Sequence, residues 1–122
     1  LILGIGPIIN EALEAVEKLK SVSQKSIAIA EMSSIKPMDE IFLKEMVKRN
    51  FKTWITLEEH GFVGGMGIRI NNWLFKNDAS KTIKTINLNT PDQFIHTLGK
   101  QNYLRKELNI DESFIYNKLL SL

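Results

Sequence analysis

The chain has 122 residues, the size of a single domain. It is 43% apolar and 25% charged, with a net charge of only +2 and no cysteine. Acidic and basic side chains are interspersed, so we interpret the basic runs at 44–52 and 100–106 as solvated helix faces and expect no nucleic-acid partner. A disulfide framework is excluded, and no apolar run approaches the ~20 residues of a membrane span.

These features predict a cytoplasmic protein with no membrane partner. The chain begins without Met, on an apolar run that is typical of a strand already under way. We therefore expect one domain, residues 1–122, that is a fragment of a longer polypeptide.

Predicted strands and helices alternate through the first half of the chain. Residues 1–5 form an apolar strand, and Pro7 suits the first turn of a helix that runs to about Lys20. Residues 26–32 are apolar on both faces, as in a parallel strand covered by helices. The next helix opens at Pro37, with acidic residues in its first turn.

The second half continues this alternation. We predict strands at Thr53–Leu57 and Thr82–Leu88, and helices at Gly65–Phe75, Phe94–Glu107 and Asp111–Leu122, the last with Asp111 as its N-cap. Four alternating units indicate an α/β fold, a three-layer α/β/α sandwich with a mainly parallel sheet. Right-handed crossovers leave few topologies, and we predict the strand order 2-1-3-4.

With that order, chain direction reverses between strands one and three, and open α/β sheets bind ligands at such a point. The residues that follow these two strands are therefore candidates for a crevice or an interface. They are Gly4, Gly6, Glu58, Glu59, His60, Gly64, Gly65 and Gly67.

Glu59 and His60 admit two interpretations. A carboxylate beside an imidazole can work as a general acid–base pair. Alternatively, the acidic strand end bonds to loop backbone or to a neighbouring subunit. We favour the second, because no nucleophile is near in sequence and one histidine with two glutamates is too few for a metal site. We predict no catalytic residue and no metal ligand, and we expect the other histidine, His96, to be structural or exposed.

The glycines after His60 also admit two interpretations. They can cradle an anion at a helix N-terminus, or they can let that helix pack closely on a neighbour. We favour packing, because the following helix is apolar nearly all round. The run from Gly4 to Ile9 resembles a dinucleotide-binding turn, with Glu31 placed to take a ribose. The match is partial, because Ile9 stands where the third glycine belongs, and we predict no cofactor site.

Several blocks of the sequence form a recognisable set. The blocks are Leu3-Gly4-Ile5-Gly6, Ser34-Ile35-Lys36-Pro37-Met38-Asp39, Glu58-Glu59-His60 with Gly64-Gly65-Met66-Gly67, and Pro91-Asp92-Gln93-Phe94. Together they resemble the C-terminal domain of transketolase-like enzymes, and their order and spacing fit that family over nearly the whole chain. This group includes transketolase, deoxyxylulose-phosphate synthase and the β subunits of 2-oxo acid dehydrogenases.

The resemblance implies a domain of an enzyme that depends on thiamine diphosphate and Mg²⁺, both bound by domains upstream. It implies packing on a preceding pyrimidine-binding domain and a homodimer at full length. The parent enzyme would transfer a two-carbon ketol unit between sugar phosphates, and the isolated chain would be inactive and bind no cofactor. Two alternatives stay open, which are a stand-alone nucleotide or small-ligand module and a 2-oxo acid dehydrogenase β subunit.

Overall fold

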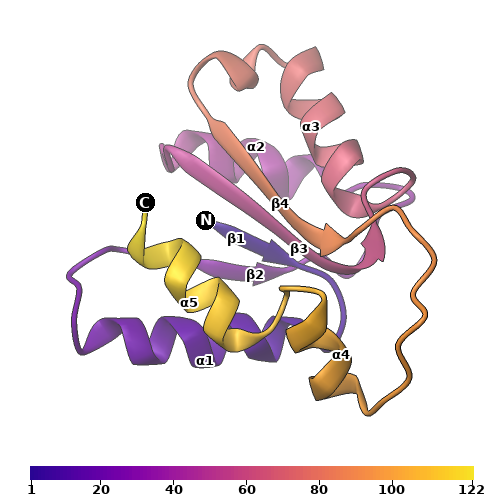
Figure 1. Cartoon of the computed structure of the whole chain (residues 1–122). Coiled ribbons are helices and arrows are strands. Elements are labelled where there is room, and N and C mark those ends of the chain that lie inside the picture. The colour runs from indigo at the N-terminus through magenta and orange to yellow at the C-terminus, as the bar shows by residue number, and fades with distance from the viewer.

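The sheet at the centre of the molecule has four parallel strands. A computed structural model describes all residues, 1–122, and Figure 1 shows the arrangement. The strands are β1 (Ile2–Gly4), β2 (Ile29–Glu31), β3 (Thr53–Gly61) and β4 (Lys84–Thr90). They lie in the order β2-β1-β3-β4, which confirms the predicted parallel sheet and its strand order.

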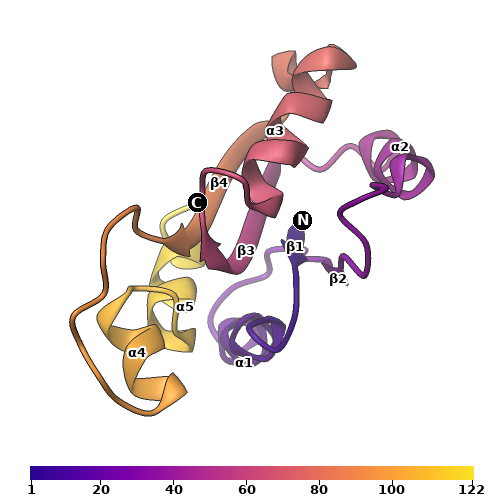
Figure 2. The same cartoon turned by 90° about the vertical axis from the view of Figure 1, so that its right-hand side faces the viewer.

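Helices cover both faces of this sheet, which makes the predicted three-layer sandwich (Figure 2). Helices α2 and α3, followed by the short 3-10 helix η1, lie on one face, and α1 and α5 lie on the other. The short helix α4 precedes α5. Their bounds are α1 (Ile9–Lys20), α2 (Glu40–Lys48), α3 (Met66–Lys76), η1 (Ala79–Lys81), α4 (Gln101–Glu107) and α5 (Glu112–Leu120).

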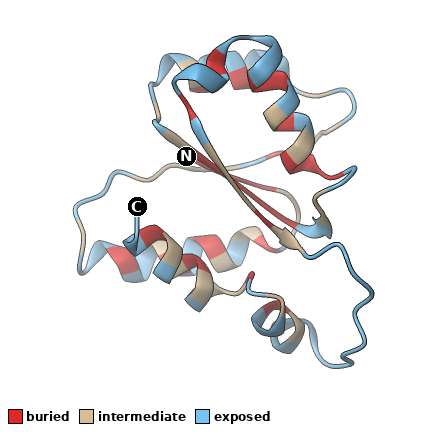
Figure 3. Cartoon of the chain, turned by 45° about the horizontal axis from the view of Figure 1, so that its top comes forward, coloured by how far each residue is buried: buried red, intermediate tan, exposed pale blue.

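Two hydrophobic cores result, one on each side of the sheet. Successive side chains of a strand point to opposite faces. Leu3 and Trp54 therefore pack towards α2 and α3, whereas Ile2 and Ile55 pack towards α1 and α5. The buried stripes along the helices face the sheet from both sides (Figure 3).

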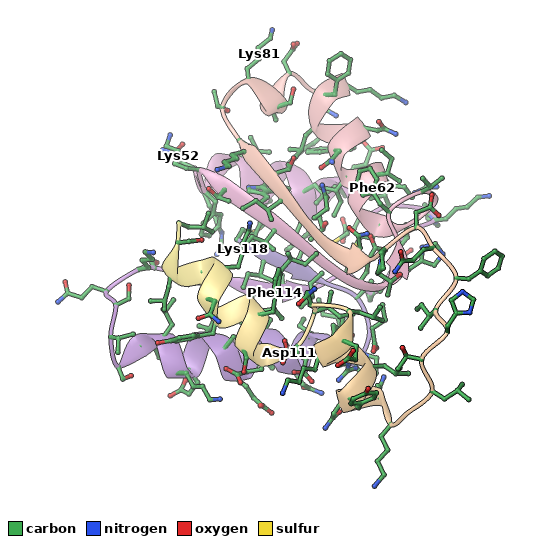
Figure 4. All side chains as sticks on the ribbon, viewed as in Figure 1. Lys52, Phe62, Lys81, Asp111, Phe114 and Lys118 are labelled. Atoms are coloured by element: carbon green, nitrogen blue, oxygen red, sulfur yellow. The ribbon has the colours of Figure 1, made fainter.

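Aspartate side chains fix where two of the helices begin. The Asp39 carboxylate accepts a hydrogen bond from the Phe42 amide at 2.9 Å, so α2 begins after it and not at Pro37. The Asp111 carboxylate accepts from the Phe114 amide at 3.1 Å, which confirms the predicted N-cap of α5 (Figure 4). None of the helices is both long and apolar enough to span a membrane.

The predicted helix Phe94–Glu107 is wrong in its first half, because α4 begins only at Gln101. Residues 91–100 form no helix or strand, and all of them are exposed. Their apolar spacing is helical, but Phe94 and Leu98 stay 89% and 94% exposed, and short helices depend on packing for their stability. Strand β3 runs on to Gly61 and does not end at Leu57, so Glu58, Glu59 and His60 lie within it.

Two leucines of α1 provide a matched test of the packing against the sheet. Leu19 is 2% exposed, whereas Leu13 is 51% exposed on the same helix. Leu19→Ala should lower the free energy of unfolding by about 2–5 kcal/mol. Leu13→Ala should change it by no more than about 0.5 kcal/mol. Urea unfolding measures both, and equal losses would contradict this placement of α1.

Candidate functional site

The carboxyl end of β3 places two successive glutamates on opposite faces of the sheet. Because side chains alternate along a strand, Glu58 points to the α3 side and Glu59 to the side of α1 and α4. The hydrogen-bond partners of the two carboxylates agree with this alternation. Each carboxylate therefore meets a different helical layer.

Glu58 is buried, with only 1% of its surface exposed, and its carboxylate caps helix α3. Its Oε2 accepts from the Met66 amide at 2.7 Å, and its Oε1 accepts from the Gly67 amide at 2.8 Å. The first amides of a helix have no partner within the helix and carry its positive end. The Glu58 carboxylate supplies both the acceptors and the negative charge.

Two glycines allow this carboxylate to come so close. A Cβ atom at Gly65 would lie 2.5 Å from Glu58 Oε2 and 2.7 Å from the main-chain oxygen of Gly61. A Cβ at Gly67 would lie 2.8 Å from both Thr56 Oγ1 and Asn87 Oδ1, two atoms that share a hydrogen bond. The geometry thus favours close packing for these two glycines, and the anion at the helix terminus is a side chain of the protein.

Glu59 binds the next part of the chain through Arg105, which is buried. Arg105 Nε donates to Glu59 Oε1 at 2.8 Å, and a terminal nitrogen of the guanidinium donates to Oε2 at 2.9 Å. The other terminal nitrogen donates to Glu11 Oε1 at 2.9 Å. Gln101 Nε2 also lies 3.1 Å from both Glu59 oxygens. Helix α4 is therefore fixed to β3 and to α1 at once.

These contacts bear on the acid–base interpretation of Glu59 and His60. The hydrogen bond from Arg105 lowers the pKa of Glu59 below its ordinary value of 4.5, so the carboxylate stays ionised near neutral pH. The same contact raises the pKa of Arg105. The His60 ring is exposed and forms no ion pair, and its Nδ1 lies 2.7 Å from its neighbour's carbonyl oxygen, Gly61 O. The arrangement does not support proton transfer between Glu59 and His60.

The other side of the predicted crevice is formed by the turn after β1. Gly4 pairs with Leu57, so the two candidate groups do lie on neighbouring strands. Gly6 has a φ of +76°, which favours glycine, and its carbonyl accepts from the Ile9 amide at 3.1 Å. The amides that follow bond to Pro7 O and Ile8 O in the same way.

Neither the start of α1 nor the start of α3 fits a bound diphosphate. The first amides of α3 face a carboxylate, and those of α1 are bonded to the preceding turn. No three acidic or histidine side chains converge into a group that could hold a metal ion. The interface role of the eight candidate residues stays a prediction.

Sequence reasoning missed Arg105 and Glu11. Arg105 belongs to a basic run that we interpreted as a solvated helix face, but it is buried between two carboxylates. Its partners lie 46 and 94 residues away along the chain. Local spacing carries no signal of such contacts.

Comparisons with known proteins agree on one family. The sequence profile described as "Transketolase, C-terminal domain" matches residues 1–111. Relatives called 1-deoxy-D-xylulose-5-phosphate synthase are 36% identical in Phocaeicola vulgatus, 33% in Blochmanniella pennsylvanica and 30% in Acinetobacter baumannii. The alignments cover 98%, 98% and 97% of this chain but 18% of each relative.

A solved structure has the same fold. It is titled "Split gene transketolase, inactive beta4 tetramer" and superimposes with a TM-score of 0.80 at 22% identity. The match covers 98% of this chain and 37% of the solved one. The chain thus spans under a fifth of the curated relatives and well under half of the solved chain.

Gly65→Ala should destabilise the fold, because its Cβ would have to displace both the Glu58 carboxylate and main chain. We expect a loss of about 1–3 kcal/mol in the free energy of unfolding. Gly61→Ala is the matched control, since nothing lies within 4 Å of a Cβ placed there. Thermal and urea unfolding of the two variants should differ clearly, and similar stabilities would contradict the close approach of Glu58.

The contact between Glu59 and Arg105 should depend on pH. A lowered pKa in the folded state means that the stabilisation is complete above pH 4.5 and is lost as the pH falls through the folded-state value. A double-mutant cycle of Glu59→Gln and Arg105→Met should give a coupling of roughly 1–3 kcal/mol at pH 7. The coupling, measured by urea unfolding, should shrink on acidification. A coupling that stays constant at every acidic pH at which the chain is still folded would show that ionisation of Glu59 does not matter.

Proposed function

Because the chain belongs to the transketolase C-terminal domain family, we propose that it works as the C-terminal domain of a longer enzyme that depends on thiamine diphosphate. The lengths of the relatives support this proposal, since the matched stretch is 18% of each relative named above. The cofactor and Mg²⁺ are then held by the remaining part of the enzyme. The first amides of α1 and α3 already have partners within the chain, which supports this assignment.

The domain's own contribution in this proposal is packing and assembly, not catalysis. One observation carries it, which is that both carboxylates at the end of β3 are bonded to groups of the chain itself. Glu58 binds the start of α3, and Glu59 binds Arg105 and Gln101. A carboxylate held in this way fixes a strand end in place and is not available for proton transfer to a substrate.

The names of the relatives favour a parent enzyme that makes 1-deoxy-D-xylulose 5-phosphate. Transfer of a two-carbon ketol unit between sugar phosphates is the second candidate, because the matching family carries the name transketolase. Assays of the full-length polypeptide for the two products distinguish these reactions. A 2-oxo acid dehydrogenase β subunit is a weaker candidate, since none of the relatives named above carries that name.

The preceding pyrimidine-binding domain of the same enzyme is the partner that we propose for this domain. A cytoplasmic location and a homodimeric full-length enzyme remain predictions. Size-exclusion chromatography with light scattering on the full-length polypeptide tests the homodimer.

Isothermal titration calorimetry tests whether the cofactor is bound by the remaining part of the enzyme and not by this domain. We expect no heat of binding when thiamine diphosphate and Mg²⁺ are titrated into the 122-residue chain, because the Glu58 carboxylate already binds the first amides of α3. The full-length polypeptide is the positive control and should bind the cofactor. Tight binding by the 122-residue chain would overturn the scaffold role.

The alternative, a stand-alone module that binds nucleotides or other small ligands, is tested by ligand-induced stabilisation. The scaffold role predicts none. Thermal-shift measurements with nucleotides and with phosphate compounds should leave the melting temperature of the 122-residue chain unchanged. A large rise with one of these compounds would favour the module.

A further inference from the structure

The segment between β4 and α4 stands away from the rest of the molecule. These residues, 91–100, are called the arm below. Both ribbon views show it passing outside the body before it returns at α4 (Figures 1 and 2). All ten residues are exposed, and none is in a helix or a strand.

Large apolar side chains of the arm face solvent. Phe94 is 89% exposed and Leu98 is 94% exposed, while Ile95 in the arm and Tyr103 just after it are about half exposed. A soluble domain rarely presents such side chains together unless they meet a partner. The arm also leaves a hollow of about 220 Å³ beside it, whose lining includes Leu104 of α4 and Leu108 just after that helix.

The backbone amides of the arm also lack partners within the chain, with one exception. Among its amides, only that of Gln93 donates a hydrogen bond to main chain, to Pro91 O. The amides from Phe94 to Lys100 have no partner in the chain. Backbone with free amides is able to pair with another segment, as strands do in peptide recognition.

Both ends of the arm are nevertheless fixed at the end of β3. At its start, Thr90 pairs with Gly61 in the sheet. At its other end, Gln101 and Arg105 bind the Glu59 carboxylate. The arm is therefore a closed loop held at the same strand end that carries the candidate site. Fixing both ends lowers the entropy that a docking segment loses on binding.

We propose that the arm is a docking element, with Phe94 and Leu98 as its anchors, and that its partner is the remaining part of the longer polypeptide. This inference rests on the proposed function. To the proposed function it adds the surface through which the rest of the polypeptide holds this domain.

The small size of the patch favours a covalently linked partner. Two free proteins need roughly 800 Å² of buried surface on each side for a stable complex. A few side chains of one arm offer less than that. A linked domain meets the arm at an effective concentration in the millimolar range, where a small patch suffices. The relatives have the necessary length, since over four-fifths of each lies outside the matched stretch.

Hydrogen–deuterium exchange tests this directly, because the arm's amides have no internal protection. The 122-residue chain and the full-length polypeptide are compared peptide by peptide. We expect exchange at 94–100 to be slower in the full-length polypeptide by at least about tenfold. The double variant Phe94→Ser/Leu98→Ser should restore fast exchange in the full-length polypeptide.

Ile41→Ser/Phe75→Ser is the matched control, since it also removes one aliphatic and one aromatic side chain, 80% and 76% exposed. It should leave the protection of the arm intact. Equally fast exchange of the arm in both proteins would overturn the proposal, as would equal loss of protection in the control.

If the arm is unprotected but other parts of the domain gain protection at full length, the docking role fails and the proposed function stands. If no part of the domain gains protection, the proposed function fails too. Protection that appears in the 122-residue chain and grows with its concentration would identify a second copy as the partner, which contradicts the proposal.

Discussion

The alternation of side chains at the end of β3 lets this strand bind both helical layers of the domain. Two neighbouring carboxylates leave the strand in opposite directions and each meets a different layer. Glu58 reaches the first amides of α3, and Glu59 reaches the guanidinium of Arg105. Moving the register of β3 by one residue would exchange these environments and place each carboxylate on the wrong face. The position of both helical layers therefore depends on a two-residue periodicity.

The fold was largely predictable from the sequence because it rests on local patterns. The strands are short apolar runs, the helices have apolar stripes, and Asp111 marks the start of α5. The one wrong helix shows the limit of such patterns. The apolar spacing in 94–100 is that of a helix, but spacing does not reveal whether a complementary surface exists. Phe94 and Leu98 are 89% and 94% exposed, and the chain there forms neither helix nor strand.

The strand ends that carry the candidate residues were predictable, but the contacts of their side chains were not. Strands β1 and β3 are neighbours, as the predicted strand order requires, while the role of the candidate residues stays a prediction. What each carboxylate binds could not be inferred, because an ion pair across 46 residues leaves no periodic trace in the sequence. The glycine-rich turn admitted both an anion and close packing, and the apolar helix after it favoured packing. The structure contains both features, since the anion at the helix is the carboxylate of Glu58.

The Arg105 cluster also bears on how the chain folds. Both acidic partners of Arg105 precede it in the sequence, and they sit on α1 and on β3, one of the two inner strands. Contacts across such separations cost loop-closure entropy, so we expect them to form late and to slow folding. During synthesis, α1 and the first three strands are made before Arg105, so Glu11 and Glu59 lack this partner until the chain has reached α4.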